Sequence, residues 1–125
     1  MPAVAGPPVQ LFGRKDSRAT QRAIRYFKER RIPVTLVDLA VRPPAPTELR
    51  RFSQRLGVRT LLDTEAPAYR DGGLAYLRMD DDDVLRRLMA DPRLLRLPLA
   101  RYGASFSVGV DEATWKTWIV GTERP

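Results

Sequence analysis

Two absences limit the residues of this chain that could carry out chemistry. Its 125 amino acids include no cysteine and no histidine. Thiolate nucleophiles, Ser-His-Asp and Cys-His arrangements, and thiolate or histidine metal sites each need at least one of these residues. Carboxylates, lysine, arginine, tyrosine and hydroxyl groups therefore remain as the candidates for catalysis or binding, and most enzyme classes are excluded.

Four consecutive carboxylates form the densest acidic group. Residues 80–83 are all aspartate and come directly before the apolar segment 84–89, whose pattern predicts a helix. Carboxylates in the first turn of a helix interact favourably with its dipole. They could also bind Mg²⁺ or Ca²⁺, but the run lacks the spaced ligands and the glycine of a calcium loop. We therefore interpret the run as a helix cap and expect no metal site.

Positive charge is concentrated in the N-terminal half. The chain has 22 basic and 15 acidic residues, a net charge of +7. Residues 14–31 contain eight basic against two acidic residues, whereas residues 61–91 contain four against eight. A basic N-terminal half could bind nucleic acid, a membrane surface or anions, but a solvent-exposed helix face has the same composition. Because the aromatic residues do not interleave with the basic ones, we expect no specific nucleic-acid binding.

A group of basic residues that could bind an anion follows the first predicted strand. Residues 9–12 alternate into Gly13, which is typical of a strand that ends in a turn. A helix is then predicted to about Arg31, with Asp16 or Ser17 as its N-cap. Free N–H groups at a helix N-terminus bind anions, although a plain cap with solvated arginines explains the same residues. The basic residues here are Arg14, Lys15 and Arg18.

The elements around this loop are expected to form a β-α-β unit. Pro33 ends the first helix, and residues 34–39 are apolar and β-branched, which predicts a mostly buried strand. Two strands joined through a helix are expected to pair in parallel, with a right-handed crossover.

Helices are predicted next, and then a return to strands. After the proline-rich residues 42–46, Thr47 is the expected N-cap of a helix that Gly57 ends. Residues 61–74 are expected to be largely irregular, although Tyr69 and Leu74 could anchor a short helix. Two short strands around Gly103 predict an antiparallel hairpin. The last helix is expected to run from the cap Asp111 to about Val120, with Trp115, Trp118 and Ile119 facing inward.

The length of the chain fits one domain. We expect a flexible leader at residues 1–8, a domain at 9–120 with a helical insert at about 46–92, and a tail at 121–125. No apolar run approaches the roughly 20 residues of a membrane-spanning helix, and the N-terminus lacks the pattern of a signal peptide. A cytoplasmic location without a membrane partner is the resulting expectation.

Several short motifs, which follow one another along the predicted elements, resemble those of the ArsC arsenate-reductase family. This family also contains the Spx transcriptional regulators. The similarity covers residues 9–120 and implies an α/β, thioredoxin-like fold. That fold consists of β-α-β, a helical insert and β-β-α, with a mixed four-stranded sheet. The motifs are residues 13–20 (GRKDSRAT), Asp38-Leu39, Thr47-Glu48-Leu49, Asp91-Pro92 through Leu97-Pro98-Leu99, and Val108-Gly109.

The resemblance places Ser17 where enzymes of the family carry their nucleophilic cysteine. A serine hydroxyl forms neither arsenic–sulfur nor disulfide bonds, and this chain has no histidine to activate it. The family's arginine before the cis-proline is Leu97 here, with Arg96 one position earlier, so the anion clamp is at least displaced. The family's further arginine near the end of the hairpin is also replaced, by residues 106–108, although Arg101 could reach from the neighbouring strand. The site implied is the anion-binding set Arg14, Lys15, Ser17, Arg18 and Arg96, with Leu97 and Pro98 as the cleft wall.

Three functions follow from this combination. The first is a redox-inactive module without a bound cofactor, which binds a small oxyanion, glutathione or a protein. The second is a glutathione-dependent arsenate reductase, or a related thiol oxidoreductase, whose catalytic cysteine is Ser17 here by substitution. The third is an Spx-like regulator that docks on RNA polymerase through basic helix faces, which would be Arg18, Arg22 and Arg25 together with Arg50, Arg51 and Arg55.

Overall fold

The computed structural model describes residues 8–123, with side chains described to residue 119. It divides into two compact units. The first is formed by Met1–Asp38 and Leu97–Pro125, and the second by Leu39–Arg96, which contains the expected helical insert. Residues 1–7 of the expected leader and residues 124–125 of the expected tail lie outside the described residues. Within the described part, no helix is long and apolar enough to cross a membrane.

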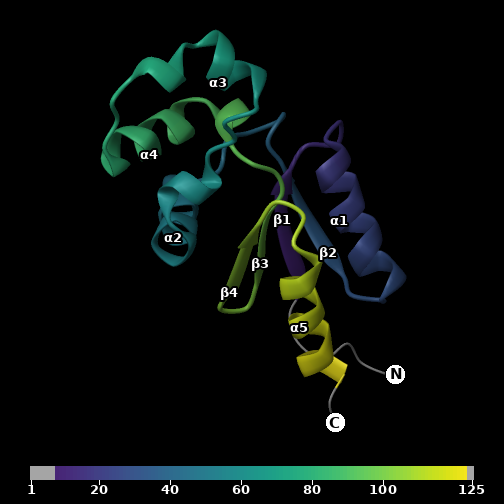
Figure 1. The fold of residues 1–125 in the computed structure, drawn as a ribbon. Coiled ribbons are helices and arrows are strands. Elements are labelled where there is room, and N and C mark those ends of the chain that lie inside the picture. The colour runs from purple at the N-terminus through teal and green to yellow at the C-terminus, as the bar shows by residue number, and fades with distance from the viewer. Residues whose placement is uncertain (1–7, 124–125) are drawn as a thin grey trace. The chain divides into compact units, whose positions relative to one another are not determined.

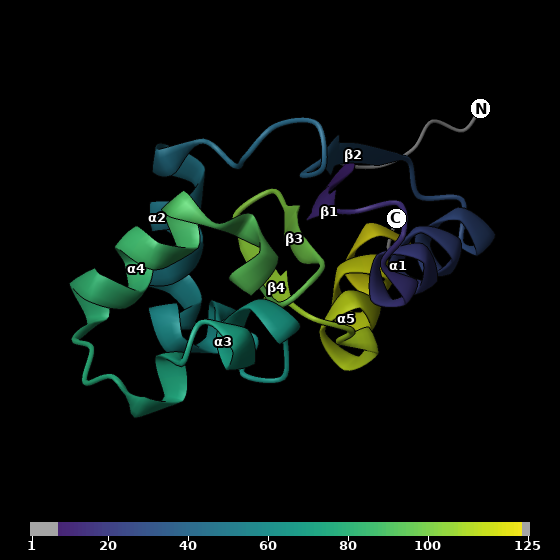
Figure 2. The ribbon, with the colours of Figure 1, turned by 90° about the horizontal axis from the view of Figure 1, so that it is seen from above.

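The first unit is a four-stranded mixed sheet, as predicted. Its strand order is β2-β1-β3-β4, in which β1 and β2 are parallel and the other pairs antiparallel. Helices α1 and α5 lie together on one face of this sheet (Figures 1 and 2). The elements are β1 Val9–Gly13, α1 Arg18–Glu29, β2 Val34–Asp38, β3 Leu99–Tyr102, β4 Ser105–Val108 and α5 Glu112–Glu123.

One strand of this sheet differs from its prediction. β2 is expected to be mostly buried, yet only Val37 of its five residues is buried, and Thr35 is exposed. The reason is its position at the edge of the sheet, where an apolar, β-branched sequence pairs on one side only. The last helix is capped as predicted, because Asp111 accepts the backbone N–H of Thr114 at 3.2 Å.

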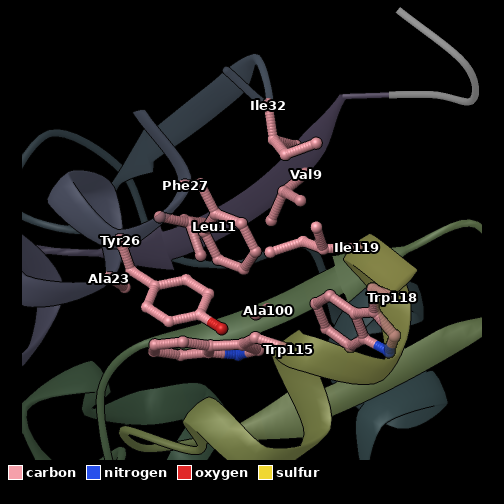
Figure 3. Packing of buried hydrophobic residues seen from close by; sticks show 10 residues of the cluster. All are labelled: Val9, Leu11, Ala23, Tyr26, Phe27, Ile32, Ala100, Trp115, Trp118 and Ile119. Carbon is pink, nitrogen blue, oxygen red and sulfur yellow. The ribbon is translucent and has the colours of Figure 1, made fainter. Parts of the chain in front are cut away.

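An aromatic cluster joins α1, α5 and the sheet. Figure 3 shows Tyr26 and Phe27 of α1 facing Trp115 and Trp118 of α5 over the buried strand β1. The ring centroids of Phe27 and Trp115 are 5.2 Å apart, and those of Tyr26 and Trp115 are 5.3 Å apart. The indole Nε1–H of Trp115 donates to Ser107 Oγ at 2.9 Å, so that both polar groups are satisfied although both residues are buried.

The second unit is helical. Its first helix begins two residues earlier than predicted, because Pro46 is the first residue of α2 and Ala45, not Thr47, is the N-cap. Proline suits this position, since its fixed φ fits the helix and its missing N–H would have no partner there. Gly57 ends α2 at φ 87°, as predicted. The elements are α2 Pro46–Leu56, η1 Val58–Leu61, α3 Pro67–Asp71, η2 Leu74–Tyr76, α4 Asp81–Ala90 and η3 Pro92–Leu94.

Replacing the indole of Trp115 tests whether its hydrogen bond stabilises the first unit. In Trp115→Phe, the Ser107 hydroxyl loses its partner inside the core, and the free energy of unfolding should fall by about 1–3 kcal/mol. Urea unfolding followed by far-UV circular dichroism measures this change. Trp115→Phe combined with Ser107→Ala removes both polar partners and should recover part of the loss; a double variant less stable than Trp115→Phe would contradict the assignment.

Candidate functional site

The loop between β1 and α1 is packed directly onto the first turns of the helix. A Cβ atom at Gly13 would lie 2.4 Å from Oγ1 of Thr20, a distance that only glycine avoids. The backbone N–H of Arg14 donates to the same hydroxyl at 3.3 Å, and Thr20 is fully buried. The glycine and the threonine therefore fix where the loop leaves the strand.

Ser17 is the N-cap of α1, so the structure selects it over Asp16. Its Oγ accepts the backbone N–H of Thr20 at 3.1 Å, and its own backbone N–H donates to the carbonyl of Arg14 at 3.0 Å. The carbonyl of Ser17 accepts the first helical hydrogen bond, from Gln21 at 3.0 Å. The hydroxyl thus acts as a local hydrogen-bond acceptor at the position where the resemblance expects a nucleophile.

The charges of the loop are partly neutralised within it. Arg14 forms a two-pronged ion pair with Asp16, from Nε at 3.1 Å and from Nη2 at 3.0 Å. Lys15 and Arg18 are exposed, and within residues 8–119 their side chains have no ion-pair partner. Two cations therefore remain available to an anion, and Asp16 adds a carboxylate that opposes it. The pairing of Arg14 with a residue two positions later could not be distinguished from solvation in the sequence.

Strand register brings the Leu97-Pro98 bond to the same end of the sheet as this loop. Phe12 lies opposite Leu99 in the antiparallel pair of β1 and β3, so the residues that follow β1 lie beside those that precede β3. The Leu97-Pro98 bond is cis, as the resemblance implies. Pro98 is fully buried and its carbonyl accepts the N–H of Gly109 at 2.9 Å, whereas Leu97 is half-buried.

Arg96 is the candidate replacement for the family's arginine before the cis-proline, and Arg101 for its arginine near the end of the hairpin. Arg101 lies opposite Gln10, and its Nε donates to the carbonyl of Gly103 at 3.2 Å, at the hairpin end of β3. This is the far end of the strand from Pro98, so the expectation that Arg101 reaches the loop is wrong. Arg96 is exposed and is the last residue of the second unit, where its backbone N–H donates to the carbonyl of Leu61. Its role beside Ser17 stays a prediction.

The acidic run caps α4, as predicted. Asp80 is the N-cap and forms a reciprocal pair with Asp83, in which each side chain accepts the other's backbone N–H. The hydrogen bond from the Asp80 backbone, assisted by Arg86, lowers the pKa of the Asp83 carboxyl below its ordinary value. Within the described residues, no group of three or more carboxylates is arranged as a metal site.

Comparison with known proteins connects this geometry to one family. A family model described as ArsC family matches residues 12–118. An arsenate reductase of Neisseria meningitidis serogroup A is 26% identical over 106 residues, which cover 82% of this chain and 91% of that protein. The counterpart from serogroup B matches equally well.

Solved structures show the same fold at lower identity. An ArsC-family-related protein from Bacteroides fragilis has a TM-score of 0.81 at 18% identity, covering 90% of this chain and 98% of that one. An arsenate reductase from Vibrio cholerae has a TM-score of 0.74 at 15% identity, covering 94% and 98%. These likenesses confirm the thioredoxin-like fold class that the order of the sequence motifs implies.

Gly13 gives a direct test of the contact that positions the loop. Gly13→Ala forces the new methyl group against Thr20 and should lower the free energy of unfolding by about 1–3 kcal/mol. Thr20→Ala removes the colliding atoms, so the double variant should be more stable than the sum of the two single changes predicts. Urea unfolding of the four proteins measures the coupling, and strictly additive changes would contradict this contact.

The cap of α4 makes a prediction about pH. Because the pKa of Asp83 is lowered on folding, its contribution to stability is present above the ordinary aspartate pKa and is lost as the pH falls through the lowered value. An NMR titration of the side-chain carboxyl carbon should give a midpoint below the ordinary value. Arg86→Gln should raise that midpoint, and a native midpoint at or above the ordinary value would refute the assignment.

Proposed function

This chain belongs to the ArsC family, and we propose that it is a redox-inactive member that binds an anion at the loop between β1 and α1. The anion class that this loop fits is a small oxyanion such as sulfate, or a carboxylate of glutathione.

The observation that carries the redox-inactive part is the chemistry of position 17. The chain has no cysteine, and the hydroxyl of Ser17 accepts a hydrogen bond in the helix cap. A thiol reductase needs a thiolate that can form and break sulfur bonds, and the helix N-terminus of a thioredoxin-like protein lowers the pKa of a thiol to provide it. A capping hydroxyl remains protonated near neutral pH and supplies no such bond.

Binding is supported by what the loop still offers. The cap satisfies the N–H of Thr20, while the N–H groups of Arg18 and Ala19 in the first turn have no acceptor within the helix. The side chains of Lys15 and Arg18 add two positive charges beside them. Because Asp16 holds Arg14 and the residue before Pro98 is a leucine, we expect weak, millimolar binding.

A second candidate is an arsenate reductase in which serine replaces the catalytic cysteine. It is favoured by the names of the relatives from Neisseria meningitidis, which match over 82% of this chain. On this alternative, glutathione is a co-substrate, and the chain departs from the enzymes of the family at Ser17 and at Leu97. The cis-Pro98 and the α1 N-terminus, both at one end of the sheet, are the parts of the scaffold that would serve it.

An NMR titration tests the binding site. Reduced glutathione and sulfate, added separately, should move the backbone amide signals of residues 14–20 and 97–99, with saturation in the millimolar range. Arg18→Gln should weaken this binding, because it removes one of the two available charges. Arg25→Gln removes an equally exposed charge two turns further along α1 and serves as the matched control. Shifts spread over all basic residues, or none near the loop, would count against the site.

Asp16→Asn sharpens the same experiment. It releases Arg14 from its ion pair and removes the opposing carboxylate, so sulfate should bind several-fold more tightly than to the native chain. Ser17→Cys then separates the two candidates: reduction of arsenate with glutathione by this variant alone would support the second. Reduction by the unaltered chain would overturn the redox-inactive proposal.

A further inference from the structure

The second unit exposes two consecutive large apolar side chains, and the second of them, Leu77, lines a groove. Tyr76 is 92% exposed and Leu77 is 46% exposed, although both follow the buried Leu74. Large apolar side chains exposed side by side on one surface are characteristic of interaction sites. The groove that begins at Leu77 has a volume of about 470 Å³ and is lined by Leu77, Arg78, Met79, Asp83, Arg86, Arg87 and Ala90.

Two walls of different kinds form this groove. One wall is formed by residues 77–79 of the connector between η2 and α4, and the other by residues of α4 itself. Figure 2 shows this connector leading into α4. On the helix, Asp83, Arg87 and Ala90 recur at spacings of four and three residues, which places them on one face. The opposite face of α4 carries the buried residues Val84 and Leu88. The groove therefore uses the side of α4 that the core of this unit leaves uncovered.

Hydrogen bonds hold the two walls in place. Arg59 donates from Nη2 to the carbonyl of Met79 and from Nε to Asp81 at 3.1 Å, so it ties the connector to the start of the helix. The reciprocal cap between Asp80 and Asp83 fixes the same junction. A groove with walls fixed in this way loses little conformational entropy when a ligand binds.

The lining of the groove combines a net positive charge with apolar side chains. Three arginines against one aspartate leave a net charge of +2 among the lining residues. Arg86 is paired with Asp83, whereas the side chains of Arg78 and Arg87 have no ion-pair partner within the described part of the chain. The apolar lining comes from Leu77, Met79 and Ala90. The lining therefore offers two available guanidinium groups together with apolar side chains, which a charged ligand alone would not cover.

We propose that this groove docks an acidic peptide segment of another protein. An apolar side chain of the peptide would pack against Leu77 and Met79, and its carboxylates would pair with Arg78 and Arg87. Arginine is among the residue types that most often dominate binding energy at protein interfaces. The net charge of +2 among the lining residues favours an acidic partner. A free phosphate ion would use the arginines but would leave Leu77 and Met79 exposed. This surface lies in the second unit and does not depend on the function proposed above.

The test begins with a random peptide library displayed on phage and selected on the full chain. Enriched peptides should carry two or more acidic residues around an apolar one. A fluorescein-labelled peptide of the enriched sequence is then measured by fluorescence anisotropy. Arg87→Glu and Leu77→Ala should each weaken its binding by about tenfold or more, which corresponds to about 1.4 kcal/mol.

Arg50→Glu is the matched control, because Arg50 is an exposed helical arginine of the same unit, outside the groove. It reverses the same charge and should change the affinity by less than about twofold. Unchanged amide spectra confirm that each variant is folded. The proposal is overturned if no acidic peptides are enriched, if Arg87→Glu and Arg50→Glu act equally, or if millimolar inorganic phosphate displaces the peptide as well as unlabelled peptide does.

Discussion

The burial of Trp115 is the constraint on which the first unit depends. This one side chain of α5 contacts the rings of Tyr26 and Phe27 on α1 and donates a hydrogen bond to Ser107 on β4. Because Trp115 is fully buried and its only polar group is satisfied, the contact fixes both helices on one face of the sheet. The start of α1, and the loop before it, take their position from that packing.

The shape of the loop between β1 and α1 does not depend on a thiol. Packing of Gly13 on Thr20, the cap at Ser17 and the cis bond before Pro98 are features of shape, and none of them requires a thiol. An arsenate reduction that proceeds through a thiol would require a cysteine, because only sulfur forms the arsenic–sulfur and disulfide bonds of that reaction. The ion pair between Arg14 and Asp16 further weakens the attraction for anions. Geometry and reactivity are therefore separable in this fold.

Local signals explain which parts of the fold could be predicted. The end of α2 at Gly57 and the cap of α4 at Asp80 depend on residues within four positions of each other, and both predictions are confirmed. The start of α2 was misassigned because Thr47 is a good cap, but Pro46 already satisfies the first helical position. Ser17 as a cap was one of two alternatives, and the hydroxyl contact with Thr20 decides between them.

By itself, the sequence determined the order of the elements and the absence of thiol and imidazole chemistry, because these follow from residue types and short spacings. The tertiary structure alone decided that β2 is an edge strand and that Arg101 lies at the far end of β3 from Pro98. It also decided that the exposed Leu77 lines a groove along α4. These three findings depend on strand order or on contacts through space. The spacing of residues along one element encodes neither the order of the strands nor such contacts.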